Sequence, residues 1–495
     1  MPNPPASAQT DATLDPADWD AFRALSHRMV DDSIDFLRAL RDRPAWVPLP
    51  GEVRAALSEE GVPHAAQGEA AVYDEFLARV LPYTNGSRSP RFFGWVQGNG
   101  TPYGMMADML ASGMNAHMAG FNDAPRLVEE RVIAWLAELM GLPAGSGGLL
   151  MSGGTMANYL GLAVARHARA GYDVRLDGTS GGPRLMLYAS AEVHSWAQKC
   201  LELLGMGSAS LRKVPVDDAF RVNVDAMRAL IHADRAAGLR PICVIGTAGT
   251  VNSGATDDLE ALADLAAAEQ LWFHVDGAFG ALARLSPALA PLARGIERAD
   301  SLALDLHKWG FLPFEIACVL VRDAEAQRAA FSLTPSYLRD EGRGVIAGGL
   351  TFAERGPELT RGFKALKVWM SFKAHGVDAI GAIVEQNVMQ ARAFAERIAQ
   401  VPGIELCAPV ALNIAVWRWV ADGFTEEQHD ALNRELLLRI QESGLAVPSG
   451  SQVRGRYVIR TCITNHRTRW ADLERFADGI APLAHAIEQE MRAAR

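Results

Sequence analysis

The sequence predicts an α/β fold in which helices flank both faces of a central, mostly parallel β-sheet. Two observations predict it. Between about residues 130 and 330, apolar runs of strand length alternate with amphipathic helical segments. These runs are apolar throughout instead of alternating with polar residues, which is typical of strands that a parallel sheet buries on both faces.

Five segments are strand candidates within this block. The helical segments between them place leucine and alanine at three- and four-residue spacing, as in DDLEALADLAAAEQ (257–270). In such a sheet the ligand binds beyond the carboxyl ends of the strands, so the residues that follow each strand are the first candidates for a site. The candidate strands are LMLYAS (185–190), PICVIGTAG (241–249), LWFHVDGAF (271–279), SLALDL (301–306) and IACVLVRD (316–323).

The remaining sequence divides into parts around this block. We expect a disordered tail over residues 1–15 and an N-terminal helical arm with pocket loops over 16–125. The sheet and its helices make a large domain over 126–385. A smaller α+β domain over 386–495 begins with a long helix and contains the strand candidates IELCAP, LNIAVWRW and RYVIRTCIT.

Composition excludes several classes of function. The 48 lysine and arginine residues and 58 acidic residues give a net charge of -10, so we expect neither a nucleic acid nor an anionic membrane as a partner. No apolar run predicts a membrane span, and the N-terminal stretch lacks the features of a signal peptide. The five cysteines are scattered without a CxxC motif, which predicts no disulfide framework, no metal site and a cytoplasmic location.

Polar residues follow the candidate strands at the edge where a ligand would bind. Considered alone, each has an ordinary structural explanation. In that interpretation Asp276 only caps a helix, and His194 is a structural histidine. The glycine turn SGGT (152–155) would only start a helix, and Lys308 would extend its stem towards solvent.

Together, however, these four features match the needs of one cofactor. Pyridoxal 5′-phosphate requires a lysine for a Schiff base and an acid beside its pyridine nitrogen. It also needs a phosphate cradle at a helix N-terminus and a flat group against its ring. Lys308, Asp276, the SGGT turn and His194 supply these parts. Burial is expected to lower the pKa of Lys308 and make its amine a better nucleophile.

Longer motifs carry a family resemblance. They are SGGTMAN, AEVHSW, HVDGAFGA, DLHKWGFLP, LTPSYLRD, RGFKALKVW and GRYVIRTCITNHRT, and they extend over roughly residues 20 to 490. With these motifs the chain resembles the group II pyridoxal-phosphate-dependent amino-acid decarboxylases, the aromatic-L-amino-acid decarboxylase-like branch of fold type I. The resemblance implies a homodimer in which the arm and a lid loop complete the neighbouring active site.

The resemblance also implies a role for each matching residue. Lys308 would bind the cofactor covalently, and Asp276 would pair with its protonated ring nitrogen. Ala278 would lie under the ring, and His194 would stack on the other face. The remaining cofactor-binding candidates are Gly154, Thr155 and His307 at the phosphate, Asp257 as an acid near the cofactor or a turn residue, and Thr250 and Thr247 as secondary contacts.

The reaction implied is release of CO2 from an L-amino acid, leaving an amine. Tyr337, in TPSYLRD, matches the family's proton donor on a mobile loop. Related enzymes with phenylalanine at that place form an aldehyde by oxidative deamination, so Tyr337 favours simple decarboxylation. The alternatives are such an aldehyde synthase and a fold type I aminotransferase, for which Arg460 is the candidate substrate-carboxylate ligand.

The substrate pocket is less well determined. The loops PRFFGWVQGNGTP and GMNAHMAGFNDAP match the family's pocket loops, partly across a dimer interface. We expect an aromatic amino acid first, a bulky aliphatic one second and a glutamate-type one third, because no dedicated carboxylate clamp is evident. Arg361 matches a family motif or is structural. The candidate pocket residues are Trp95, His117, Phe121 and Asn122.

Overall fold

The computed structural model describes residues 12–333, 342–349 and 351–494. Contacts divide the chain into two compact units, the first made of residues 1–43 and 49–83 and the second of residues 44–48 and 84–495. The four-part division expected from the sequence stays a prediction.

The first unit is helical. Asp18 caps its first helix by accepting hydrogen bonds from the backbone of Asp20 and Ala21. Within the unit, the Tyr73 hydroxyl donates to Asp32 at 3.0 Å, and Arg28 pairs with Asp74 at 2.7 Å. The helices are α1 (Trp19–Arg38), α2 (Gly51–Ser58) and α3 (Glu69–Arg79), with short 3-10 turns η1 (Ala39–Arg41) and η2 (Leu81–Tyr83).

The second unit contains a seven-stranded sheet in the order β1-β7-β6-β5-β4-β2-β3. The pairs formed by β3, β2, β4, β5 and β6 are parallel, and β7 runs antiparallel to both of its neighbours. The strands are β1 (Gly147–Met151), β2 (Leu185–Ser190), β3 (Leu211–Val214), β4 (Arg240–Thr247), β5 (Trp272–Asp276), β6 (Ser301–Asp305) and β7 (Ala317–Val321).

The sheet confirms the predicted fold class and all five candidate strands. Because β7 is antiparallel to both β1 and β6, the carboxyl end of β1 lies at the same edge as those of the parallel strands. The sequence did not predict β1 or β3. β1 begins with two glycines, and β3 (LRKV) carries two cations, so neither has the composition of a buried strand.

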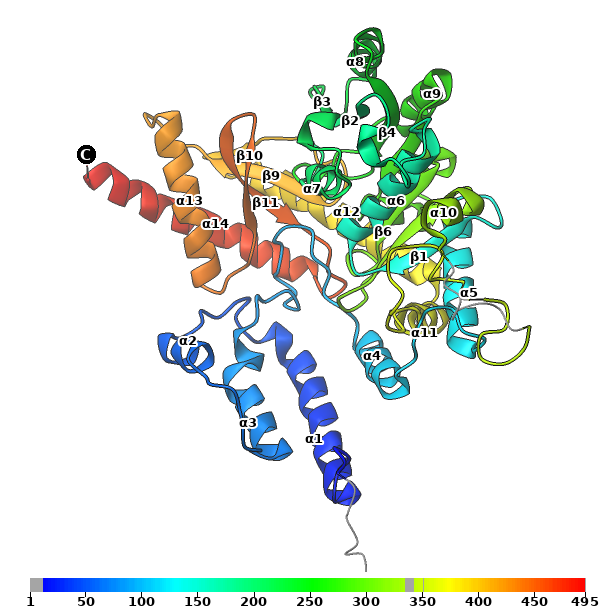
Figure 1. Cartoon of the computed structure of the whole chain (residues 1–495). Helices are drawn as coiled ribbons and strands as arrows, with labels where there is room; N and C mark the ends of the chain where they lie inside the picture. Colours follow the sequence, from blue (N-terminus) through cyan, green and yellow to red (C-terminus); the bar gives the residue numbers. More distant parts are fainter. Residues whose placement is uncertain (1–11, 334–341, 350, 495) are drawn as a thin grey trace, which may run out of the picture. The chain divides into compact units, whose positions relative to one another are not determined.

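Helices flank this sheet, with α6 packing against β1, β4, β5, β6 and β7 (Figure 1). The helices before and between the strands are α4 (Pro102–Met114), α5 (Ala124–Leu139), α6 (Gly154–Arg169), α7 (Trp196–Leu203), α8 (Val224–Ala236), α9 (Leu259–Glu269), α10 (Ala324–Phe331) and α11 (Ala365–His375). The 3-10 turns are η3 (Gly178–Ser180), η4 (Ser208–Ser210), η5 (Gly280–Leu285), η6 (Ala290–Ala293) and η7 (Ile296–Arg298).

A smaller antiparallel sheet follows, in the order β10-β11-β9-β8. Its own hydrophobic cluster includes Trp417 from the sheet and the stacked rings of Phe394 and Phe476 from the helices. Its elements are α12 (Val377–Ile398), β8 (Ile404–Leu406), β9 (Ile414–Trp419), α13 (Glu426–Glu442), β10 (Ser449–Val453), β11 (Arg456–Cys462) and α14 (Trp470–Ala493). Among the described residues, no helix combines the length and apolar character that crossing a membrane requires.

Candidate active site

Segments from five strand ends meet around one cavity of about 440 Å³. The strands leave the sheet at the same edge, so residues that are far apart in sequence come together there. β1 supplies the turn into α6, β2 supplies His194, and β4 supplies Thr247. β5 and β6 supply Asp276 and Lys308. The structure therefore brings together the four features that the sequence singled out.

Lys308 forms an ion pair with Asp305 across one turn. The Lys308 Nζ lies 2.8 Å from Asp305 Oδ2, and Asp305 is only 2% exposed. Desolvation alone lowers the pKa of Lys308, but the charge and hydrogen bond of Asp305, together with the charge of Asp276, raise it above its ordinary value. The expectation that burial lowers the pKa of Lys308 was therefore wrong, because the attraction of the ammonium to Asp305 and Asp276 outweighs the effect of desolvation.

Asp276 is held by two donors at the end of β5. The indole Nε1–H of Trp196 donates to Asp276 Oδ2 at 2.6 Å, and the backbone N–H of Ala278 donates to Oδ1 at 3.1 Å. The carboxylate is buried, at 5% exposure. Such contacts fix the orientation of the carboxyl group, so the cavity contains a preorganised acidic side chain.

The N-terminus of α6 forms the opposite wall. The first N–H groups of a helix have no partner within the helix, and they favour an anion such as phosphate. The first helical residue is Gly154, and a Cβ at this position would lie 2.8 Å from Asp305 Oδ2. Any larger residue would therefore fill the space beside these N–H groups.

Two histidines border the cavity as neutral rings. The Nδ1 atom of His194 accepts a hydrogen bond from the Trp196 backbone N–H at 3.2 Å, which places the proton of the neutral ring on Nε2. The Nδ1 atom of His307 accepts from the Ile316 N–H at 3.2 Å. Burial lowers the pKa of both histidines.

Two unpaired polar atoms among the described residues of the cavity show that its residues fit pyridoxal phosphate. The Thr247 hydroxyl and the Asp305 Oδ1 are buried and have no hydrogen-bond partner among the described residues. A bound group carrying donors and acceptors would satisfy such atoms. Ala278 keeps the floor of the cavity small, and the α6 N-terminus suits a phosphate.

Two predicted cofactor residues do not line this cavity. Asp257 accepts hydrogen bonds from the backbone N–H groups of Val222 at 2.7 Å and Thr247 at 2.9 Å, and burial raises its pKa to about 6. Thr250 is buried and shares a 3.0 Å hydrogen bond with Ser253. Both residues hold the loop after β4, and their cofactor roles stay predictions.

Of the predicted pocket residues, Trp95 lines the cavity. His117 and Phe121 stack edge to face at 5.4 Å, and Asn122 bonds through its side chain to the Gly344 carbonyl. These three residues are not among those that line the cavity of this chain. Tyr337 lies outside the described residues.

Neither arginine candidate is free to bind a substrate carboxylate. Arg460 is 2% exposed and donates to the carbonyls of Asn252 and Val251 and to the Ser449 hydroxyl. Burial lowers its pKa. Arg361 is likewise buried and pairs with Glu129 at 2.5 Å. Their positions argue against a transaminase-type carboxylate clamp.

Sequence reasoning gave no role to several residues that the cavity contains. Trp196 lies within the motif AEVHSW and Asp305 within DLHKW. The position of Asp305, three residues before Lys308, was the sequence signal that could have indicated their ion pair. Glu192 and Glu315 also line the cavity. Asn252 donates to the first at 3.0 Å, and Lys364 pairs with the second at 2.8 Å, contacts between distant segments that sequence spacing does not reveal.

A buried hydrogen-bond chain supports the α6 wall from behind. The Nε2–H of His274 donates to Asn158 Oδ1 at 2.7 Å, and its Nδ1 accepts from Ser301 at 2.7 Å. Ser301 in turn accepts from the Trp272 indole at 2.8 Å, and the Asn158 amide donates to the Gly154 carbonyl at 2.8 Å. All of these hydrogen bonds can form together only when the His274 imidazole is neutral, because Nδ1 must accept while Nε2–H donates.

This histidine predicts acid sensitivity of folding. Burial lowers the pKa of His274 to about 3 in the folded protein, whereas a histidine in the unfolded chain titrates at about 6.5. Between these pH values the unfolded chain binds a proton at His274 and the folded protein does not, so acid favours unfolding. The resulting stability is present above about pH 6.5 and is lost as the pH falls towards the folded pKa. We expect about 1 kcal/mol of this loss between about pH 7 and pH 5.5 in urea unfolding. His274→Gln should remove about this much of the loss in unfolding free energy between the two pH values. An unchanged pH dependence of unfolding would contradict the conclusion that His274 stays neutral in the folded protein.

Comparison with known proteins gives one consistent result. The family model described as the pyridoxal-dependent decarboxylase conserved domain matches residues 50–420. The aromatic-L-amino-acid decarboxylase of Bacillus atrophaeus is 32% identical over 471 residues, which cover 94% of this chain and 96% of the relative. Phenylacetaldehyde synthase of Arabidopsis thaliana is 27% identical over 462 residues, covering 91% and 93%. A crystal structure of Oryza sativa TDC with PLP and tryptamine matches with a TM-score of 0.88 at 26% identity, covering 96% of this chain and all of that one.

Proposed function

Because this chain belongs to the pyridoxal-dependent decarboxylase family and is a pyridoxal-phosphate-dependent amino-acid decarboxylase, we propose that its substrate is an aromatic L-amino acid, converted to the amine and CO2. One observation carries the pyridoxal-phosphate chemistry of the proposal: a lysine and an oriented carboxylate from neighbouring strands face the same cavity, beside a helix N-terminus suited to phosphate. Relatives named for aromatic, tryptophan and tyrosine decarboxylation support the substrate class.

Bound pyridoxal phosphate supplies the sink for the electron pair that remains on Cα when CO2 leaves. We propose that Lys308 attaches the cofactor and that the Asp276 charge keeps its ring nitrogen protonated. Trp196 holds that carboxylate in place through its 2.6 Å hydrogen bond. Gly154 and Thr155 would bind the phosphate through the α6 N-terminus, with His307 beside them. His194, as a neutral ring, would contact the cofactor face.

The charges in the cavity favour an uncharged substrate side chain. Among the described residues that line it, Lys308 is the single lysine or arginine, whereas four residues are acidic: Glu192, Asp276, Asp305 and Glu315. A glutamate-type side chain would therefore meet several carboxylates and no cation apart from the proposed cofactor lysine. Trp95 and Phe279 provide aromatic surface, which suits a ring and also accepts a bulky aliphatic group.

The test is a product assay on the cofactor-loaded protein with a panel of L-amino acids. We expect equal amounts of CO2 and amine, with kcat/KM highest for an aromatic substrate. A higher kcat/KM for leucine or glutamate would overturn the substrate class. Tyr337→Phe should shift the products towards aldehyde, ammonia and hydrogen peroxide, because the proposed donor of the proton to Cα is lost. In that reaction CO2 is still released, and dissolved O2 and water are consumed, with O2 as the two-electron oxidant that is reduced to hydrogen peroxide. Aldehyde as the main product of the unaltered chain would instead establish the synthase activity for which the Arabidopsis relative is named.

We also propose that the protein is a homodimer. On α1, the apolar side chains of Trp19, Phe22 and Met29 are 60%, 37% and 42% exposed and recur along one face of the helix. On α3, Val72 and Phe76 are 53% and 40% exposed. Apolar groups gathered this way on a helix mark an interaction surface, and a second copy is the partner that the family resemblance implies.

Sedimentation velocity tests the dimer. Phe22→Glu, which places a charge in this face, is expected to shift the protein towards the monomer, whereas Arg23→Glu, a charge change at a 68% exposed neighbour, should leave the dimer intact. A monomeric unaltered protein would refute the proposal.

A cytoplasmic location is proposed as well, supported by five free cysteines. Recovery of the protein from a secreted fraction would contradict it.

A further inference from the structure

A second, larger hollow lies at the opposite edge of the main sheet. This groove of about 1210 Å³ is lined by the amino ends of β4 and β5, the residues before β6, and the carboxyl ends of α6 and α9. None of the described residues proposed for decarboxylation lines it. Its volume is large for an inorganic ion and sufficient for a nucleotide-sized molecule.

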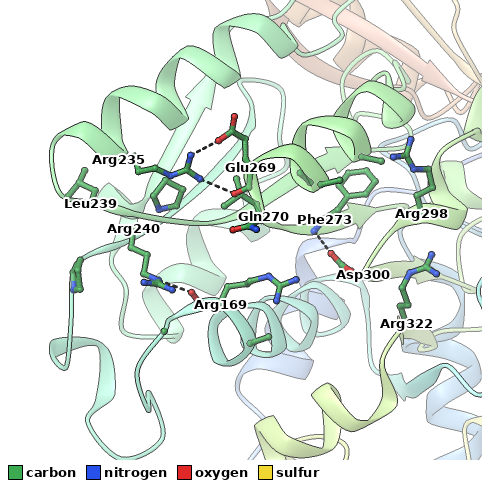
Figure 2. A pocket seen from close by; sticks show the side chains of 18 of the residues that line it. Arg169, Arg235, Leu239, Arg240, Glu269, Gln270, Phe273, Arg298, Asp300 and Arg322 are labelled. Carbon is green, nitrogen blue, oxygen red and sulfur yellow. Dashed lines mark hydrogen bonds and ion pairs between the residues drawn. The ribbon is translucent and has the colours of Figure 1, made fainter.

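The groove concentrates positive charge in an acidic chain (Figure 2). Two of its arginines are already neutralised: Arg235 pairs with Glu269 at 2.5 Å, and Arg298 pairs with Asp264 at 2.7 Å. Three more remain without a carboxylate partner among the described residues, namely Arg169, Arg240 and Arg322.

The guanidinium of Arg169 has no hydrogen bond or ion pair within the described part of the chain, and its Nε is buried without a partner. It lies over the Trp272 ring at 5.8 Å, which limits its motion. Arg240 uses only its Nε, which donates to the Arg169 carbonyl at 2.9 Å. Arg322 donates to the carbonyls of Ala299 and Glu297.

Beside these cations lies the carboxylate of Asp300, whereas the two glutamates of the groove, Glu269 and Glu297, pair with Arg235 and Arg284. Asp300 uses Oδ2 to accept the Phe273 N–H at 2.8 Å, which leaves Oδ1 for a hydroxyl or amino group of a ligand. In Figure 2 Arg169 extends between Arg240 and Asp300, with Arg322 beyond. Apolar side chains complete the wall, including Pro183, Leu239 and Phe273.

We propose that this groove binds a nucleotide. Guanidinium groups match phosphate oxygens in geometry and charge, the Asp300 carboxylate suits ribose or base donors, and the apolar wall suits a base. The site is independent of the decarboxylase cavity and lies beyond the proposed function.

Isothermal titration of the cofactor-loaded protein tests the proposal, because bound pyridoxal phosphate blocks the phosphate cradle of α6. ATP, AMP, adenosine and inorganic phosphate serve as probes. We expect saturable binding of AMP or ATP, weaker binding of phosphate and of adenosine, and loss of affinity as salt rises. Arg169→Gln and Arg240→Gln should each weaken nucleotide binding about tenfold or more while decarboxylation stays unchanged.

Arg294→Gln is the matched control, because it removes one charge from a 62% exposed arginine that does not line the groove. It should leave nucleotide affinity unchanged. Three results would overturn the proposal: no saturable heat with either nucleotide, phosphate binding as tightly as AMP, or equal weakening in Arg294→Gln and Arg169→Gln. Retained decarboxylase activity shows that each variant is folded.

Discussion

Replacing Lys308 with alanine is expected to abolish decarboxylation, lowering kcat by about a thousandfold or more. The lysine is the proposed point of cofactor attachment, and single groups that act in covalent and proton-transfer steps commonly supply factors of this size. The variant should also lose the visible absorption of the covalently bound cofactor. Steady-state CO2 release and absorption spectra at saturating pyridoxal phosphate measure both effects.

This substitution has a second consequence, in the cofactor-free protein, that is separate from catalysis. It leaves the carboxylate of Asp305, which is 2% exposed, without its ion partner at 2.8 Å, and breaking a buried pair from one side costs about 3 kcal/mol. Without cofactor, Lys308→Ala should therefore unfold at a lower urea concentration than the unaltered chain. The double variant Lys308→Ala with Asp305→Asn removes the stranded charge and should recover most of that stability while remaining inactive. Recovery of activity in either variant would contradict the role proposed for Lys308.

The sequence predicted the catalytic edge of the sheet better than it predicted the walls around it. Lys308, Asp276 and His194 each follow a strand with a clear apolar run, and parallel strands must end at one edge. The α6 turn was found through its glycines, although the strand before it, β1, was not predicted. Their convergence is therefore a consequence of topology. Positions such as Asp257 fall outside this logic, because a carboxylate after a strand serves a backbone loop as readily as a cofactor.

What the sequence could not supply was the partner of each charged group. The sign of the Lys308 pKa shift depends on a 2.8 Å contact with Asp305, and burial without that contact would have given the opposite direction. Arg460 is a plausible carboxylate ligand by sequence alone, yet two carbonyls and a hydroxyl already occupy it. The Arg460 contacts with Val251 and Asn252 join segments more than 200 residues apart, and spacing does not encode them. Asp305 lies only three residues before Lys308, but the sequence does not show that the two side chains meet. Chain packing decides them.

The charge of Asp276 is the second feature with a large expected effect. Asp276→Asn keeps the shape of the side chain and an oxygen that can accept a hydrogen bond, but it removes the negative charge that would hold the cofactor ring nitrogen protonated. We expect kcat to fall about a hundred- to a thousandfold, the range for a preorganised electrostatic group in a catalytic site. Trp196→Phe, which removes the 2.6 Å hydrogen bond to this carboxylate together with part of the buried indole ring, should lower kcat about tenfold.

Asp257→Asn is the matched control for this charge. Asp257 is also a buried carboxylate, 4% exposed, in the loop after the neighbouring strand β4, but it accepts backbone N–H groups and does not line the cavity. Its replacement should lower the free energy of unfolding and leave kcat of the cofactor-loaded enzyme within about threefold, since no reacting group loses its charge. Equal losses of kcat in both variants would mean that Asp257 acts on the cofactor, as the family resemblance suggests. A loss confined to Asp276→Asn would assign the electrostatic role to the carboxylate that Trp196 holds.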